Sequence, residues 1–124
     1  MRPLSPHLSI YKWQITNSLS ILHRLAGVGL FFGLIILNIL FVDSYYNGTG
    51  LIHNFWGNKF GYLIANIFLL LIILGFSYHF INGIRYLYFD ITTNISNRAI
   101  QLTAYLMLFF ASILATFLCL IIIL

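Results

Sequence analysis

His79 has the surroundings that most strongly suggest chemistry in this sequence. It lies within residues 60 to 84, which contain no charged residue, and Arg85 follows it six positions later. On a helix that separation is roughly 9 Å along the axis. An ionisable side chain inside an apolar span is costly, so it usually faces a partner, a cavity or a cofactor. We therefore expect His79 to have such a companion.

Two glycines flank His79 at helical spacing. Gly75 and Gly83 lie four residues to either side, so all three residues share one helix face. A haem bound through the imidazole would lie close to its helix, and glycines would remove the side chains that collide with it. Alternatively, His79 hydrogen-bonds a backbone carbonyl or a serine of another helix, and the glycines allow close helix packing. The spacing alone leaves both interpretations open.

A second polar group opens the first apolar stretch, in the sequence "SILHRLAG". Ser20, His23 and Arg24 stand at i, i+3 and i+4, so they are expected on one helix face. A histidine and an arginine there can hold haem propionates, while the serine and the arginine can hydrogen-bond the carbonyl of a quinone headgroup. The alternative is an interfacial arginine that extends to the headgroups, beside a capping serine.

Composition places these residues in a membrane. The chain has 124 residues, 61% hydrophobic and only 6% charged, whereas soluble domains are about a quarter charged. Three stretches carry no charge, and about 20 apolar residues cross a bilayer as a helix. We predict an all-α fold with three transmembrane helices in a single domain, residues 1–124. The expected segments are an N-terminal arm (1–16) and helices at 17–42, 60–88 and 98–124.

The charges indicate topology more than binding. Most basic residues precede the first span or separate the second from the third, which places the N-terminus on the cytoplasm-like or matrix-like side: Arg2, Lys12, Arg24, Arg85 and Arg98. No run of lysine and arginine suggests nucleic acid. Cys119 is the only cysteine, so no internal disulfide is expected. The first 13 residues have neither signal-peptide nor transit-peptide character, and no cleavage is expected.

Other positions carry structural expectations. Pro3 and Pro6 favour an extended arm that lies against a partner, and Asn17 or Ser18 is expected to cap the first helix. Arg85 is expected to pair with Asp90 or to contact a peripheral subunit. Gly29 and Gly33 are expected to form a helix-packing motif. His7 and His53 are expected to be surface or interface residues.

Two long motifs resemble a known family. "RPLSPHLSIY" followed by "SILHRLAG", and then "HFINGIRYLYFD", are similar to signatures of the cytochrome b subunit that anchors succinate dehydrogenase in the membrane. Their order, their spacing and the three-span layout agree over nearly the whole chain. The resemblance implies a membrane-anchor domain that forms part of a heterodimeric bundle of transmembrane helices.

The resemblance also implies a cofactor arrangement. His79 would be one axial ligand of haem b, and a second small anchor subunit would supply the other. Gly75 and Gly83 would pack beside the haem, and His23 and Arg24 would lie near its propionates. Ser20 and Arg24 would help bind ubiquinone.

The same resemblance implies the partners and the role. The arm would rest against an iron–sulfur subunit, which receives electrons from a flavoprotein that oxidises succinate. The chain would be non-catalytic alone, because no bond-making residue needs to come from this subunit. Hydrolytic chemistry is not expected, because no carboxylate lies within a span to act as acid or base. It would help pass electrons to ubiquinone as a subunit of succinate:ubiquinone oxidoreductase.

The expected location is the mitochondrial inner membrane with the N-terminus in the matrix, and the alternative is a bacterial cytoplasmic membrane. The main rival function is a haem-free structural anchor of the same complex or of a fumarate reductase-type complex. A transporter is disfavoured because only His79 and Asn82 lie near any polar path.

Overall fold

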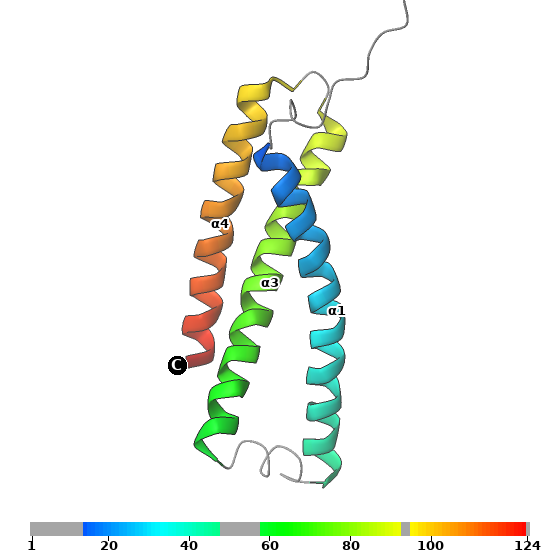
Figure 1. Cartoon of the computed structure of the whole chain (residues 1–124), viewed down its shortest axis with the longest axis vertical. Coiled ribbons are helices and arrows are strands. Elements are labelled where there is room, and N and C mark those ends of the chain that lie inside the picture. The colour runs from blue at the N-terminus through cyan, green and yellow to red at the C-terminus, as the bar shows by residue number, and fades with distance from the viewer. Residues whose placement is uncertain (1–13, 48–57, 93–94, 124) are drawn as a thin grey trace, which may run out of the picture.

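The computed structural model describes residues 14–47, 58–92 and 95–123, and within these ranges the fold is three α-helices without strands (Figure 1). They are α1 (Ile15–Asn47), α3 (Lys59–Ile91) and α4 (Asn97–Ile123). Each is long and apolar enough to cross a membrane. The predicted all-α class with three membrane-length helices is confirmed.

The helix ends differ from the predicted ones in detail. α1 begins at Ile15 and ends at Asn47 instead of covering 17–42. Asn17 and Ser18 therefore lie inside its first turn, and the prediction that one of them caps the helix was wrong. At 33 residues, α1 is about 50 Å long and extends beyond a hydrocarbon core of about 30 Å.

Side-chain caps mark the other two helix starts. The Asn58 side chain accepts a hydrogen bond of 2.6 Å from the amide of Gly61, in the extended conformation of an N-cap residue. The Ser96 hydroxyl accepts one of 3.2 Å from the amide of Ala99. Both residues satisfy amides that have no intrahelical partner.

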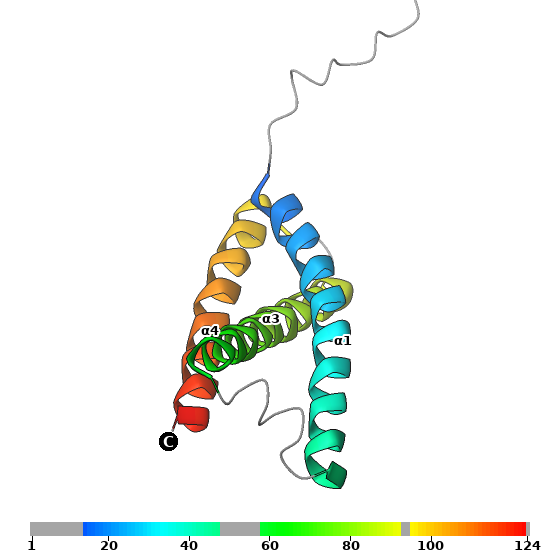
Figure 2. The same cartoon turned by 60° about the horizontal axis from the view of Figure 1, so that its bottom comes forward.

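The middle helix of the bundle is α3, which packs against both of the others. α1 and α4 converge at the end where α1 begins and diverge toward the other end (Figure 2). Leu19, Ala104 and Met107 form a buried cluster at the convergence. Ala104, Ala111 and Ala115 line one buried stripe of α4, and small residues of this kind let helices approach closely in a membrane.

Most of the molecular surface is apolar. Large hydrophobic side chains are exposed along all three helices, as expected where lipid or partner helices replace water. Ser112 and Thr116 lie on this surface, and their hydroxyls donate to the carbonyls of Phe109 at 2.7 Å and Ile113 at 2.8 Å. Their polar groups are therefore satisfied within α4, as hydrocarbon requires. The described residues form the membrane-spanning helices of an integral membrane protein.

Buried polar side chains gather in one half of the bundle. Ser77, Asn82 and Arg85 are 1%, 0% and 7% exposed, and all belong to the second half of α3. We call residues 15–30, 75–91 and 97–107 the polar half. The apolar half comprises residues 31–47, 59–74 and 108–123.

Candidate functional site

His79 of α3 meets His23 of α1 inside the polar half. Their rings are stacked, with centroids 4.0 Å apart and planes inclined by 6°. Nδ1 of His79 lies 3.1 Å from the main-chain carbonyl oxygen of His23. A carbonyl oxygen only accepts, so Nδ1 carries the hydrogen and donates it. The neutral imidazole then keeps its lone pair on Nε2.

This hydrogen bond makes the two interpretations of His79 that the sequence left open compatible with each other. The bond to a backbone carbonyl is present, but it occupies one of the two ring nitrogens. Histidines that bind metals usually donate their other N–H to a carbonyl or carboxylate in this way. The imidazole can therefore be tied to α1 and still offer Nε2 to a metal.

A glycine that the sequence analysis did not single out lies against the His79 ring. A Cβ on Gly27 would be 2.9 Å from Cε1 and 3.4 Å from Nδ1 of His79. The sequence shows only that Gly27 shares a helix face with His23, because it follows His23 by four residues. The sequence does not show that this face of α1 meets His79.

The two glycines predicted beside His79 have different surroundings. A Cβ on Gly75 would lie 3.7 Å from Leu30 of α1, an ordinary packing distance. A Cβ on Gly83 would meet nothing within 4 Å. Gly83 therefore leaves open space along α3, one turn from His79, whereas Gly75 borders α1.

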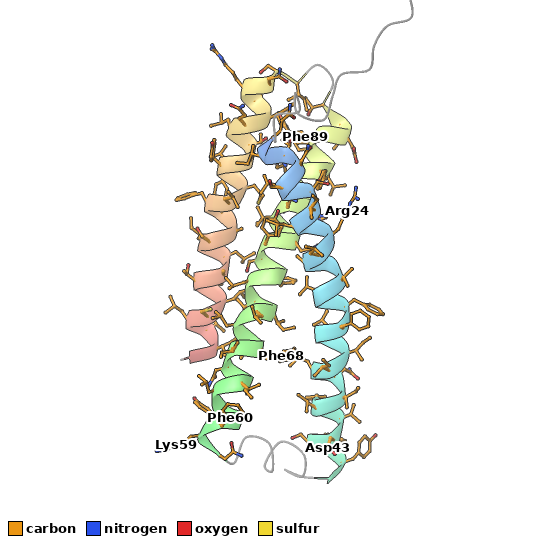
Figure 3. All side chains as sticks on the ribbon, viewed as in Figure 1. Arg24, Asp43, Lys59, Phe60, Phe68 and Phe89 are labelled. Atoms are coloured by element: carbon orange, nitrogen blue, oxygen red, sulfur yellow. The ribbon has the colours of Figure 1, made fainter. Side chains whose placement is uncertain are left out.

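The three residues of the "SILHRLAG" group do not act together in the chain by itself. His23 turns into the contact with α3, where its Nε2 atom is buried and has no hydrogen-bond partner among the described residues. Arg24 is exposed and its side chain extends outward from α1 (Figure 3). Ser20 is half-buried. The fold thus brings His23 to His79 and leaves Arg24 on the outer surface of the bundle.

Arg85 contacts α4. Its Nε donates to the Thr103 hydroxyl at 3.3 Å and its Nη2 to the carbonyl of Ile100 at 3.3 Å, and its guanidinium carbon lies 4.7 Å from the ring centre of Phe89. The predicted local pair with Asp90 does not form. Asp90 is five positions after Arg85, so the two side chains point to different sides of the helix, and Asp90 is exposed where Arg85 is buried.

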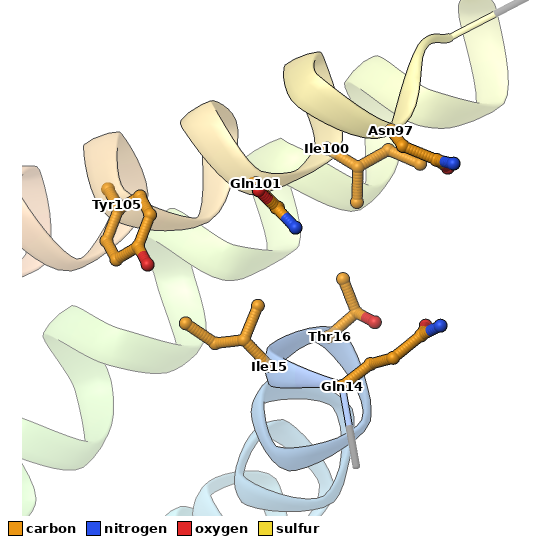
Figure 4. A pocket seen from close by; sticks show the side chains of 7 residues that line it. All are labelled: Gln14, Ile15, Thr16, Asn97, Ile100, Gln101 and Tyr105. Atoms are coloured by element: carbon orange, nitrogen blue, oxygen red, sulfur yellow. The ribbon is translucent and has the colours of Figure 1, made fainter. Parts of the chain in front are cut away.

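A polar pocket lies at the same end of the bundle, between the beginnings of α1 and α4 (Figure 4). Its volume is about 610 Å³, and Gln14, Thr16 and Gln101 contribute amide and hydroxyl groups to its walls. None of its lining side chains is charged, and it includes none of the site residues predicted from the sequence. The pocket is therefore separate from the contact between His23 and His79.

The metal-binding capacity of the described ranges is limited. Residues 14–47, 58–92 and 95–123 contain no group of three or more histidine, cysteine or acidic side chains that could hold a metal ion. A metal bound at His79 would therefore need further ligands from outside these residues, as the iron of a haem has from the porphyrin.

Three membrane-length helices, with an imidazole tied between two of them, define an integral membrane protein with a candidate cofactor ligand. The comparison with known families adds the particular assignment. A family described as "Succinate dehydrogenase/Fumarate reductase transmembrane subunit" matches residues 1–119. The chain belongs to this family, and both the resemblance and the membrane-anchoring function inferred from the sequence motifs are confirmed.

Several curated relatives carry cytochrome names. The chain is 42% identical to the succinate dehydrogenase cytochrome b556 subunit of Rickettsia bellii, over 84% of this chain and 79% of the relative. It is 39% identical to the cytochrome b560 subunit of Reclinomonas americana, over 86% and 76% of the two chains. The Marchantia polymorpha cytochrome b560 subunit is 35% identical, over 92% and 85%. These relatives come from a bacterial genus and from eukaryotes.

Proposed function

We propose that this chain is the membrane-anchoring cytochrome b subunit of a succinate dehydrogenase and that Nε2 of His79 binds the iron of haem b. The observation that carries the proposal is the hydrogen bond from Nδ1 of His79 to the His23 carbonyl. It fixes the tautomer whose free lone pair is on Nε2. Family membership and the cytochrome names of the relatives support the same assignment.

The residues near His79 fit a haem. Gly83 leaves open space one turn from the ligand, where a macrocycle can approach the helix. Gly75 faces Leu30 of α1, and its proposed packing beside the haem rests on its helical spacing from His79. The buried Nε2 of His23 has no partner within the described residues, and we propose that it and Arg24 lie near the propionates. When bound, haem supplies a one-electron carrier.

We propose that a second protein ligand would come from another chain. An imidazole that holds the haem iron would direct a ring nitrogen at the metal. The His23 ring instead lies face to face with His79, nearly parallel to it. His23 is therefore unsuited to be the opposite ligand, which supports a histidine from a second small anchor subunit.

For the quinone, we propose a site at Ser20 and Arg24. They are one helical turn apart on α1, and the exposed Arg24 can reach a headgroup that arrives from the lipid or from a partner interface. Its positive charge would favour negative charge that develops on the quinone oxygens. Electrons would arrive from the flavoprotein through the iron–sulfur subunit, and this chain would hold ubiquinone within reach.

Charge distribution supports a proposed orientation. Arg24 lies toward the end where α1 begins, and Asp43 and Lys59 lie at the opposite end (Figure 3). With Arg85 and Arg98 also near the first end, that end would face the mitochondrial matrix or the bacterial cytoplasm. The N-terminus would then be on the matrix side of the inner membrane, or on the cytoplasmic side in a bacterium.

A His79→Ala substitution tests the haem assignment. We expect the purified complex to lose its b-type absorption in a reduced-minus-oxidised spectrum, because the protein ligand from this chain is gone. Tyr62→Phe is the control, since it changes an exposed side chain of the same helix, 17 residues from the ligand in sequence. An unchanged spectrum in the His79 variant would reject the haem proposal in favour of a haem-free structural anchor.

An Arg24→Ala substitution tests the quinone assignment. Quinone reduction should slow, while succinate oxidation by an artificial soluble acceptor should continue at close to its normal rate. Arg98→Ala removes another exposed arginine and should leave both rates unchanged. Equal loss of both activities in the Arg24 variant would contradict a specific role at the quinone.

A further inference from the structure

We propose that Gly27 and the main-chain carbonyl of His23 together position the His79 imidazole for metal binding. α3 would carry the ligand, and α1 would set its orientation and tautomer. This inference rests on the proposed function, because it concerns how the same ligand is held. It assigns a role to a glycine and to a carbonyl group that no side-chain pattern in the sequence identifies.

Three contacts from α1 restrict the His79 ring. The hydrogen bond of 3.1 Å from Nδ1 to the His23 carbonyl fixes one ring edge. The stacked His23 ring, 4.0 Å away and nearly parallel, covers one face. The backbone at Gly27 lies against Cε1, where a Cβ would be only 2.9 Å away. The His79 ring is therefore restricted at Nδ1, on one face and at Cε1.

Gly27 is needed for this arrangement because of its place on the helix. In an α-helix the carbonyl of residue 23 accepts the amide of residue 27, so the two groups are adjacent. A side chain at position 27 would stand beside the carbonyl that the imidazole must reach. Real Cβ atoms essentially never approach another atom as closely as 2.9 Å. A methyl group there would displace a rigid ring that two other contacts hold in place.

The orientation matters for the ligand's chemistry. A hydrogen bond from the distal ring nitrogen to a carbonyl fixes the tautomer and makes the coordinating nitrogen more basic. Loss of such an outer contact typically weakens metal binding by about 10–100-fold. We expect Gly27→Ala to weaken haem retention by about 10-fold, or to retain haem with an altered ligand field.

Gly29 provides a matched control on the same helix. It lies two residues further along α1, and a Cβ there would meet nothing within 4 Å. Gly29→Ala therefore adds the same methyl group and the same helix propensity without touching His79. Gly29 lines an apolar cavity with Gly75, so this variant also reports the effect of filling space beside that glycine. A difference between the two alanine variants isolates the contact at position 27.

The experiment compares the unmodified complex with Gly27→Ala, Gly29→Ala and His79→Ala. Haem content per complex, the midpoint potential and the low-spin signal in electron paramagnetic resonance are measured on each purified assembly. We expect Gly29→Ala to match the unmodified protein. Gly27→Ala should lower the haem content or shift the potential and the low-spin signal. If Gly27→Ala matched Gly29→Ala in all three, the positioning role would be rejected.

Two further outcomes keep the inference separate from the proposed function. If His79→Ala retained the haem with unchanged spectra, the proposed function itself would fail, whatever the glycine variants did. If Gly27→Ala did not assemble, electron–nuclear double resonance of the unmodified complex would decide. It should detect an exchangeable proton on the distal nitrogen of the axial imidazole from this chain. Absence of that proton would overturn the proposed hydrogen bond.

Discussion

Two glycines of α1 meet side chains of α3, one in each half of the bundle, and the partners respond differently. In the apolar half, a Cβ on Gly33 would collide with the terminal methyl group of Ile72. That methyl group ends a flexible side chain and can rotate away. In the polar half, Gly27 meets the rigid ring of His79, which is bonded to a carbonyl on its other edge. The same close approach serves packing in one half and positions a candidate ligand in the other.

The two halves of the bundle also differ in the hydrogen bonds between helices. Tyr78, His79 and Arg85 of α3 each hydrogen-bond a neighbouring helix, and all three lie in the polar half. Within lipid there is no hydrophobic driving force between helices, so packing and interhelical hydrogen bonds drive association. We therefore expect substitutions of these side chains to weaken the bundle more than changes in the apolar half.

The largest loss of stability is expected for Arg85→Met. The change keeps an extended apolar side chain but removes two hydrogen bonds from a buried cation to Thr103 and Ile100. We expect a decrease of about 2 kcal/mol in the free energy of unfolding of the purified complex in detergent, measured by denaturant titration. Arg98→Met changes an exposed arginine and should have no measurable effect. Equal effects at the two positions would contradict the proposed role of Arg85.

A smaller loss is expected for Tyr78→Phe. The hydroxyl donates a hydrogen bond of 2.8 Å to the carbonyl of Leu19 and so links α3 to the beginning of α1. Interhelical bonds of this kind in membranes are worth about 0.6 kcal/mol on average and up to about 1.7. The same titration should detect a loss in that range. Tyr62→Phe, on an exposed face of α3 in the apolar half, is the control, and a loss as large there would erase the distinction between halves.

The smallest effect is expected for Gly33→Ala. Rotation of the Ile72 side chain should accommodate the new methyl group, so the change in the free energy of unfolding should stay within about 0.5 kcal/mol. Haem content should also be unchanged, unlike in Gly27→Ala. If Gly33→Ala reduced haem content as strongly as Gly27→Ala, the two glycine contacts would be equivalent and the comparison would fail.

Much of the fold was predictable because it depends on local composition. The charge-free stretches identified the three helices, and the errors at their ends were of a few residues. The pair of Arg85 with Asp90 was wrongly predicted because a partner near in sequence was considered before one on another helix, while a contact with a peripheral subunit stays a prediction. The actual partners of Arg85, Thr103 and Ile100, are 18 and 15 residues away.

The candidate site was predictable only as separate motifs. His79 was identified by its depth in an apolar span, and His23 by its place in "SILHRLAG". The contact between their rings depends on two quantities, the relative rotation of α1 and α3 and their relative shift along the helix axes. The contact of Gly27 with the His79 ring depends on the same two quantities. No periodicity within a single helix specifies those two quantities.

The sequence by itself determined that this chain enters a membrane as three helices and that an imidazole lies where hydrocarbon makes a free polar group costly. Those properties follow from residue types counted along one segment at a time. Only the tertiary structure decided that a carbonyl of α1 takes the Nδ1 hydrogen of His79 and that Gly27 makes room for the ring. The physical reason is that a hydrogen bond and a close contact between helices depend on distances of a few ångströms, which packing sets.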